Sequence, residues 1–256
     1  MGQLDDRVAV VTGAGRGIGR AIALRYAVEG ATIVISSRTA ADLDSVLSDA
    51  GPAQQGTAVV ADAMDAEEAR RPVGEALERF GRVDILVNNV GGNAGGNPDP
   101  FVGDDDGFHR NLTLNLTSAW WTSTAVLPAM RERGFGRIIN IGSGASKRAA
   151  ASVAYTTAKH GMVGLTRQLA AATARYGITV NCLCPGWTRT SQLDFELIAS
   201  RSGSTAEEVR ARAESENLQH RILEAEELAG MATLLAGDDG KGITGQVISV
   251  DGGYRI

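Results

Sequence analysis

A tyrosine, a lysine and a serine are spaced along this sequence in a way that could carry proton transfer. Tyr155 and Lys159 stand four residues apart at the start of a segment of helical period, so their side chains share one helix face, one turn apart. A phenol is a poor base near neutral pH, and a nearby ammonium favours its ionised form. Ser143 follows the apolar run 137–141, where its hydroxyl could hydrogen-bond a substrate oxygen at the carboxyl end of a strand.

A glycine-rich turn follows the first β-branched run and precedes a segment of helical period. Its sequence is TGAGRGIG over residues 12–19. Glycine permits positive φ angles and lets backbone N–H groups approach a pyrophosphate, and the helix that begins there adds a favourable dipole. By itself such a turn can be merely a tight strand-to-helix connection. Its place after the first strand of an α/β chain predicts a dinucleotide site.

The end of the second predicted strand bears on which dinucleotide this site prefers. Enzymes that prefer NAD usually carry an acidic residue there, which accepts hydrogen bonds from the ribose hydroxyls. Here the strand ends in Ser36, Ser37 and Arg38, with no acid. Arg38, together with Arg16 in the glycine turn, offers planar cationic groups to a 2′-phosphate, so we expect NADP(H) rather than NAD(H). The alternative is that both arginines are ordinary solvated residues.

Short β-branched runs alternate with longer segments of helical period, which is typical of a parallel sheet covered by helices on both faces. The predicted strands are Val8–Thr12, Thr32–Ser36, Thr57–Val60, Ile85–Asn88, Arg137–Ile141, Thr179–Leu183 and Gln246–Val250. The predicted helices are Gly17–Glu29, Ala40–Asp49, Ala66–Phe80, Asp106–Arg131, Ala154–Arg175 and Glu224–Ala236. We expect one domain over residues 1–256, an α/β Rossmann-type fold with a doubly wound, seven-stranded sheet in a three-layer sandwich.

Two segments interrupt this alternation. The first, Gly91–Pro98, is too rich in glycine for regular structure and follows a strand on the side where such sheets bind ligands. It could shape the substrate entrance or be an idle flexible loop. The second, at about 187–220, is a polar insertion that looks like a substrate lid, with helical pieces near Asp194–Ala199 and Ala206–Glu216.

The composition excludes several classes of protein. The chain is 43% hydrophobic and 21% charged, as globular proteins are, and its formal net charge of −5 argues against a nucleic-acid partner. The acidic N-terminus lacks the features of a signal peptide and no apolar stretch could cross a bilayer, so we expect a soluble, cytoplasmic protein with no membrane partner. Cys182 and Cys184 are expected to be reduced core residues on opposite faces of a strand. The three histidines lack metal-ligand spacing, so we expect no metal.

Together these motifs resemble those of the short-chain dehydrogenase/reductase family, in its single-domain branch, and are similar to its 3-oxoacyl thioester reductases. The resemblance runs from the glycine turn to the closing stretches GQV at 245–247 and DGG at 251–253. It implies that Ser143 polarises a carbonyl and that Tyr155 transfers the proton. It further implies that Lys159 binds the nicotinamide ribose and that Asn115 holds a proton-relay water.

The resemblance also implies a set of cofactor-binding residues. Asp62 would contact the adenine, and Thr188 would help to hold the nicotinamide carboxamide. Val90 departs from the alanine usual in the family, a change of local packing rather than of chemistry. The full set is Gly13, Gly15, Arg16, Gly17, Ile18, Gly19, Ser37, Arg38, Asp62, Ala63, Asn89, Gly91, Tyr155, Lys159, Pro185, Gly186, Thr188 and Thr190.

Three functions stay open from the sequence. The first is a ketoreductase or alcohol dehydrogenase that moves a hydride between NADP(H) and a small-molecule carbonyl or secondary alcohol. The second is a same-fold enzyme of another reaction class, such as an epimerase, although those relatives usually carry a longer C-terminal region. The third is a catalytically silent NADP sensor, against which the intact set of catalytic residues counts. The resemblance suggests a homotetramer, or a homodimer. Trp120 and Trp121 lie in a long apolar segment, so we expect core or subunit-contact residues rather than substrate platforms.

Overall fold

The computed structural model describes residues 2–51, 56–97, 99–191 and 193–255. Within these residues, seven strands form one parallel sheet in the order β3-β2-β1-β4-β5-β6-β9. The strands are β1 (Val8–Thr12), β2 (Thr32–Ser37), β3 (Gly56–Val60), β4 (Ile85–Asn88), β5 (Gly136–Ile141), β6 (Ile178–Pro185) and β9 (Val247–Val250). The strand order reverses between β1 and β4, so a ligand crevice is expected at the carboxyl ends of these two strands.

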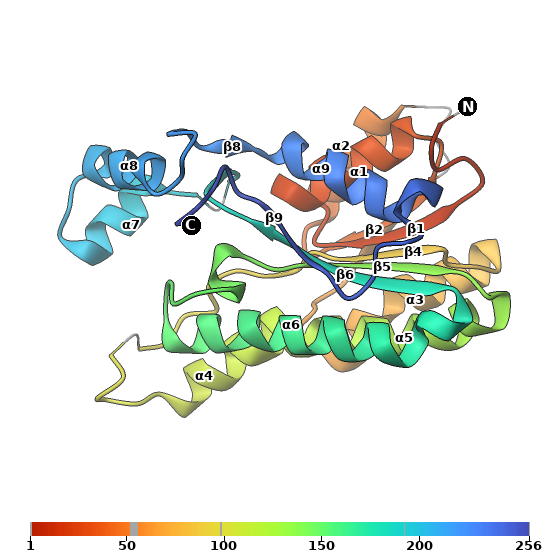
Figure 1. The fold of residues 1–256 in the computed structure, drawn as a ribbon, viewed down its shortest axis with the longest axis horizontal. Helices are drawn as coiled ribbons and strands as arrows, with labels where there is room; N and C mark the ends of the chain where they lie inside the picture. The colour runs from red at the N-terminus through yellow and green to blue at the C-terminus, as the bar shows by residue number, and fades with distance from the viewer. Residues whose placement is uncertain (1, 52–55, 98, 192, 256) are drawn as a thin grey trace.

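Helices cover both faces of the sheet (Figure 1). One face carries α1 (Gly17–Val28), α2 (Ala40–Ala50) and α9 (Ala225–Ala236), and the other carries α3 (Ala66–Phe80), α5 (Ser118–Arg133) and α6 (Val153–Thr173). Successive strand residues point to opposite faces, so each strand feeds two cores. In β1, Ala9 and Val11 pack under α1 and α9, whereas Val8 and Val10 pack under α3 and α5. The predicted three-layer Rossmann-type fold is thus confirmed.

One predicted helix is divided in the structure. The sequence predicts a continuous helix over Asp106–Arg131, but the chain forms α4 (Asp105–Leu112), then a π-helical turn at Thr113–Thr117, and then α5. Hydrogen bonds in a π turn run from i to i+5, which breaks the period that sequence patterns assume. Such turns are frequent at functional sites. This one contains Asn115, a predicted catalytic residue.

The predicted lid contains two helices, α7 (Phe195–Ser202) and α8 (Ala206–Ser215). A short parallel pair closes its base, in which β7 (Thr188–Arg189) pairs with β8 (Leu223–Glu224). Sequence analysis missed this pair because two residues are too few to show a strand pattern. The lid and α4 both extend past the sheet at the left of Figure 1.

The ends of the helices follow local sequence signals. Gly81 and Gly134 adopt the left-handed conformation directly after α3 and α5, with φ of 68° and 65°. Short 3₁₀ turns occur at Gly144–Ser146, Ala174–Tyr176 and Asp238–Gly240. None of the helices in the described chain is long and apolar enough to span a membrane.

Candidate active site

Lys159 and Tyr155 lie at the start of α6, beside the carboxyl end of β5. The hydroxyl of Ser152 caps this helix by accepting a hydrogen bond from the Tyr155 N–H at 3.2 Å. Lys159 is 2% exposed, and its Nζ donates to the carbonyl oxygen of Ile141 at 2.9 Å. The same Nζ lies 5.8 Å from the centre of the Tyr155 ring. The predicted tyrosine and lysine are therefore neighbours on one helix face, with the ammonium held by the end of β5.

Ser143 follows β5 and begins a tight 3₁₀ turn. Its Oγ accepts from the N–H of Ala145 at 3.1 Å, and its own N–H donates to Oγ of Ser146 at 3.1 Å. These bonds fix the backbone of Ser143 and use its oxygen only as an acceptor. The hydroxyl hydrogen is thereby left to donate to a substrate oxygen.

Asn115 is fully buried in the π turn and holds the start of the glycine-rich loop. Its Oδ1 accepts from the N–H of Gly92 and its Nδ2 donates to the Gly92 carbonyl, both at 2.9 Å. A Cβ at Gly91 would lie 3.0 Å from Oδ1 of Asn115 and 3.1 Å from Nζ of Lys159. Gly91 is therefore a place where the backbone passes between two predicted catalytic side chains.

The glycine-rich loop is anchored further along by Asn111, which sequence analysis did not identify. Its Oδ1 accepts from Ala94 at 3.2 Å, and its Nδ2 donates to the carbonyl of Gly95 at 2.9 Å. Asn111 stands one turn before Asn115, so the two carboxamides hold successive parts of the loop. Its four-residue spacing from Asn115 could have identified Asn111 in the sequence. These contacts hold the loop at several points, and its part in the substrate entrance stays a prediction.

The predicted phosphate-binding turn has the backbone geometry that the glycines suggest. Gly13 and Gly17 have φ of 63° and 57°. A Cβ at Gly19 would come within 2.3 Å of Nδ2 of Asn89, which donates to the carbonyls of Thr12 and Gly13. In the described chain, no side chain caps the N-terminus of α1 at Arg16. The N-terminus of α1 therefore presents backbone N–H groups that no side chain caps, and these residues fit the phosphates of a dinucleotide.

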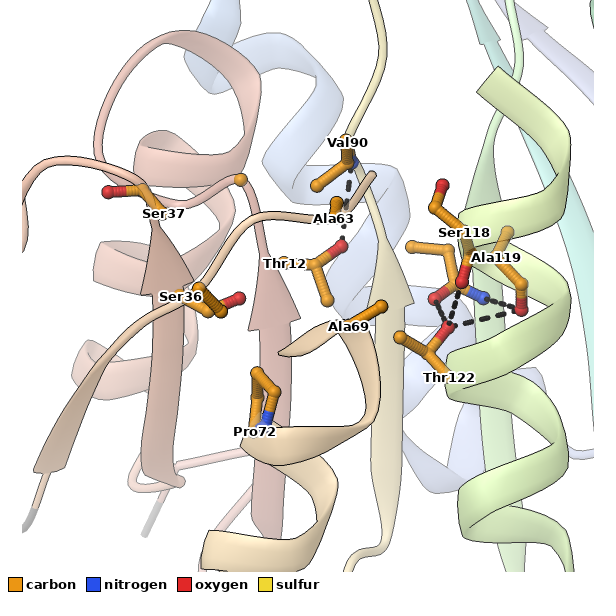
Figure 2. Close-up of a pocket in the computed structure, with 13 residues that line it drawn as sticks. Thr12, Ser36, Ser37, Ala63, Ala69, Pro72, Val90, Ser118, Ala119 and Thr122 are labelled. Carbon is orange, nitrogen blue, oxygen red and sulfur yellow. Dashed lines mark hydrogen bonds between the residues drawn. The ribbon is translucent and has the colours of Figure 1, made fainter. Parts of the chain in front are cut away.

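A small pocket lies at the carboxyl ends of the central strands (Figure 2). Of the predicted cofactor residues, Gly13, Ser37 and Ala63 line it. Thr12, Ser36, Asn88 and Val90, which lie at or beside the ends of predicted strands, line it as well. Six further lining residues were not identified from the sequence. They lie directly after β3 or on the facing helices α3 and α5, and they are Ala61, Ala69, Pro72, Ser118, Ala119 and Thr122.

The remaining predicted cofactor residues do not line this pocket. Arg16 and Arg38 are exposed. The carboxylate of Asp62 accepts from the N–H of Met64 at 2.9 Å, which fixes its orientation. Gly15 packs so tightly that a Cβ there would lie 2.9 Å from Cβ of Asp42. Ile18 packs against the core beneath α1.

The loop after β6 lies against the glycine turn. Thr188 is buried, and its Oγ1 donates to the carbonyl of Gly186 at 3.1 Å. A Cβ at Gly17 would lie 3.1 Å from Cβ of Thr190, so Thr190 faces the N-terminus of α1. The predicted segment Pro185–Thr190 therefore lies beside the predicted phosphate site, although the two are far apart in sequence.

A chain of buried polar side chains runs beneath the site and was not predicted. Oγ1 of Thr122 donates to Oδ1 of Asn88 at 2.5 Å, Nδ2 of Asn88 donates to Oδ1 of Asn140 at 2.8 Å, and Nδ2 of Asn140 donates to Oγ1 of Thr166 at 2.9 Å. Buried amides need such partners. This series of hydrogen bonds therefore connects α5, β4, β5 and α6 and fixes their relative positions. In the sequence, the asparagines inside otherwise apolar strands, Asn88 and Asn140, could have indicated this set of buried hydrogen bonds.

The expectation that Cys182 and Cys184 point to opposite faces of a strand is wrong. Their Sγ atoms lie 3.7 Å apart, both buried, beneath Gly142. Side chains alternate with a period of two, so residues i and i+2 share a face. Hydrogen bonding from Cys182 lowers the pKa of the Cys184 thiol to about 6. Both thiols are free, as expected.

No metal-binding group of three or more histidine, cysteine or acidic side chains occurs in the part of the chain that the structure describes.

The fold and this site together define a Rossmann-type protein with a glycine turn at the switch point of its sheet. The family model for short chain dehydrogenases matches residues 7–197, and the chain belongs to this family. It is therefore an oxidoreductase of a family that acts on hydroxyl and keto groups with a nicotinamide cofactor.

Several relatives match over nearly the whole chain. Short-chain reductase protein NovJ of Streptomyces niveus is 37% identical, over 97% of this chain and 94% of its own. The D-beta-hydroxybutyrate dehydrogenase of Rhizobium meliloti is 35% identical, over 97% of this chain and 98% of its own. The crystal structure of levodione reductase superposes with a TM-score of 0.91 at 31% identity, covering 97% of each chain.

Proposed function

We propose that this protein is an NADP-dependent oxidoreductase that interconverts a small-molecule carbonyl and a secondary alcohol. The observation that carries the proposal is the position of Lys159, whose buried ammonium lies beside the Tyr155 ring and close to Gly91 and Asn115. Folding alone does not require a buried lysine at this place, because burying an ammonium costs free energy. A role in proton transfer explains why it is there.

Each catalytic side chain has a distinct task in the proposed reaction. Ser143 donates a hydrogen bond to the carbonyl oxygen, and Tyr155 gives that oxygen a proton in reduction or takes it in oxidation. Lys159 orients the ribose of the cofactor, while Asn115 supports the route of the proton to solvent. The bound nicotinamide supplies or accepts the hydride.

The preference for NADP(H) over NAD(H) rests on the end of β2. No acidic side chain follows Ser37 there, and Arg38 is exposed to receive a 2′-phosphate. Arg16 at the start of α1 supplies a second guanidinium. The rest of the cofactor would lie along the turn Gly13–Gly19, with Asp62 and Ala63 at the adenine and Pro185–Thr190 at the nicotinamide.

The relatives support a carbonyl or secondary alcohol as the reacting group. They include a levodione reductase of Leifsonia aquatica at 32% identity and a polyketide ketoacyl reductase of Streptomyces violaceoruber at 37%. We further propose a cytoplasmic homotetramer built on α5 and α6. Exposed Trp120 on α5 and Val153 on α6 supply apolar surface for such contacts.

A screen of NADPH consumption over a panel of ketones and acyl thioesters, with the reverse screen over alcohols and NADP⁺, tests this function. Tyr155→Phe should lower turnover by at least about a hundredfold, because it removes the acid/base group. Its dissociation constant for NADPH should stay within about twofold of the wild type. Tyr176→Phe, on the turn after α6, is the matched control and should keep full activity. Turnover retained by Tyr155→Phe would remove this residue from its role.

A further inference from the structure

Glu216, directly after α8, is the acceptor for two donors from distant parts of the chain. Its Oε2 accepts from the indole Nε1 of Trp187 at 2.7 Å. Its Oε1 accepts from the guanidinium of Arg255. The Glu216 side chain is only 11% exposed, so this carboxylate is largely shielded from solvent. The end of the lid is thereby tied to the loop after β6 and to the C-terminal segment.

The connection to Trp187 reaches the proposed nicotinamide loop. Trp187 lies between Gly186 and Thr188, two of the predicted cofactor residues. Its backbone carbonyl accepts from the N–H of Leu223 at 2.9 Å, beside the β7–β8 pair. The backbone and the side chain of Trp187 are thus both fixed by the base of the lid.

The connection to Arg255 reaches the turn that holds Ser143. The backbone N–H of Arg255 donates to the carbonyl of Glu216 at 2.8 Å, and Tyr254 forms an antiparallel bridge with Asn217. The Tyr254 ring packs on Gly144, where a Cβ would come within 2.5 Å of it. Burial, together with the nearby Glu216 carboxylate, raises the pKa of the Tyr254 phenol. The C-terminal segment therefore lies between the lid and the residue after Ser143.

Only a carboxylate can serve both donors at this place. Ionised glutamate presents two acceptor oxygens and no donor, whereas a glutamine side chain has one acceptor and an NH₂ group. In a Glu216→Gln variant the NH₂ group would therefore face either the Trp187 indole N–H or the Arg255 guanidinium. One contact must break, although the shape of the side chain is almost unchanged.

We propose that Glu216 is a positioning residue that joins the lid, the nicotinamide-side loop and the Ser143 turn into one unit. Closure of the lid over a substrate is thereby coupled to the placement of Thr188 and of Ser143. The inference rests on the proposed function, because it assigns the lid and the loop to substrate and cofactor. The coupling between the three segments is a property of the folded chain that can be measured without turnover.

Hydrogen exchange of the apo protein tests the coupling directly. Glu216→Gln should speed amide exchange at least about tenfold in two segments distant in sequence, 143–147 and 187–189, since their shared anchor is lost. The matched control is Glu214→Gln, which removes an exposed ion pair with Arg210 on the same helix and should leave both segments unchanged. Unchanged exchange in both segments of Glu216→Gln would overturn the proposal, whatever the enzyme's substrate.

A double-mutant cycle with Trp187→Phe tests the consequence for the reaction. In the wild-type background, Glu216→Gln should lower kcat/KM about tenfold, the size of one lost hydrogen bond to a charged group. In the Trp187→Phe background, glutamine no longer faces two donors, and the same change should cost less than about twofold. Equal losses in the two backgrounds would show that Glu216 acts independently of Trp187. A wild type without carbonyl turnover would instead contradict the proposed function, and the exchange result would still stand.

Discussion

Asn115 and Gly92 hold each other through two hydrogen bonds, one in each direction between the carboxamide and the backbone, both at 2.9 Å. This pairing places the first residues of the glycine-rich loop against a predicted catalytic side chain. Asn111 extends the arrangement to Ala94 and Gly95. The loop is therefore held at defined points beside predicted catalytic residues, and each anchor can be tested.

Asn111→Ala should loosen the loop without unfolding the protein. The change leaves the Ala94 N–H and the Gly95 carbonyl without their partner, at a cost of about 1–2 kcal/mol. We expect faster hydrogen exchange at Ala94 and a several-fold higher KM for carbonyl substrates, while the dissociation constant for NADPH is unchanged. Asn93→Ala is the control, because Asn93 makes a single bond within the exposed loop, at 2.8 Å to the Gly95 N–H. A similar KM for both variants would argue against a role of the anchored loop in substrate binding.

Arg38→Asp should reverse the cofactor preference. An aspartate at this position repels a 2′-phosphate and accepts hydrogen bonds from the ribose hydroxyls of NAD. We expect the KM for NADPH to rise about tenfold to a hundredfold, and the KM for NADH to fall. Steady-state kinetics with both cofactors measure the change, with Arg79→Asp as an equal change of charge at a distant exposed position. A wild type that prefers NADH would contradict the assignment.

Glu227 should contribute to stability in a pH-dependent way. Nη1 and Nη2 of Arg221 donate to its two oxygens at 2.6 and 2.7 Å, and this pairing lowers the pKa of Glu227 to about 2. Because the folded pKa lies below the unfolded value, the stabilisation is present above the unfolded pKa, about 4.3, and is lost as the pH falls toward 2. Glu227 is 35% exposed, so solvent screening limits the effect to about 1 kcal/mol or less.

Thermal unfolding of Glu227→Gln measures that contribution. At pH 7 the variant should melt about 2 °C lower than the wild type. The difference should shrink between about pH 4 and pH 2, where the wild-type carboxylate gains its proton. A difference that stays constant from pH 7 to pH 2 would mean that the charge of Glu227 does not matter.

The two cysteines should be unreactive in the folded protein. Cys182 and Cys184 are fully buried, so a thiol reagent reaches them only when the fold opens. We expect labelling by an aromatic disulfide reagent to be at least about a hundredfold slower in buffer than in denaturant, where both thiols should react. Rapid labelling of the native protein would show that this part of β6 opens readily.

The local elements could largely be predicted from the sequence. The β-branched runs and glycine stops placed the strands and most helices within a few residues, and β1, β4 and α3 have the predicted bounds. Tyr155 and Lys159 were placed together because helical spacing alone puts them on one face. The π turn at Thr113–Thr117 could not be predicted, because one wider turn between two helices leaves no distinct signal in the sequence. The cysteine prediction failed through a wrong application of strand alternation.

The sequence by itself determined the fold class, the glycine turn and the Tyr155–Lys159 pair, since each follows from local spacing or from the alternation of strands and helices. Tertiary structure alone decided which distant segments meet. Thr190 lies on Gly17, Asn115 holds Gly92, and Glu216 joins Trp187 to Arg255. Local propensity carries no information about which loop crosses which strand end. Those contacts arise when the parallel sheet brings the carboxyl ends of β1, β4, β5 and β6 to one edge.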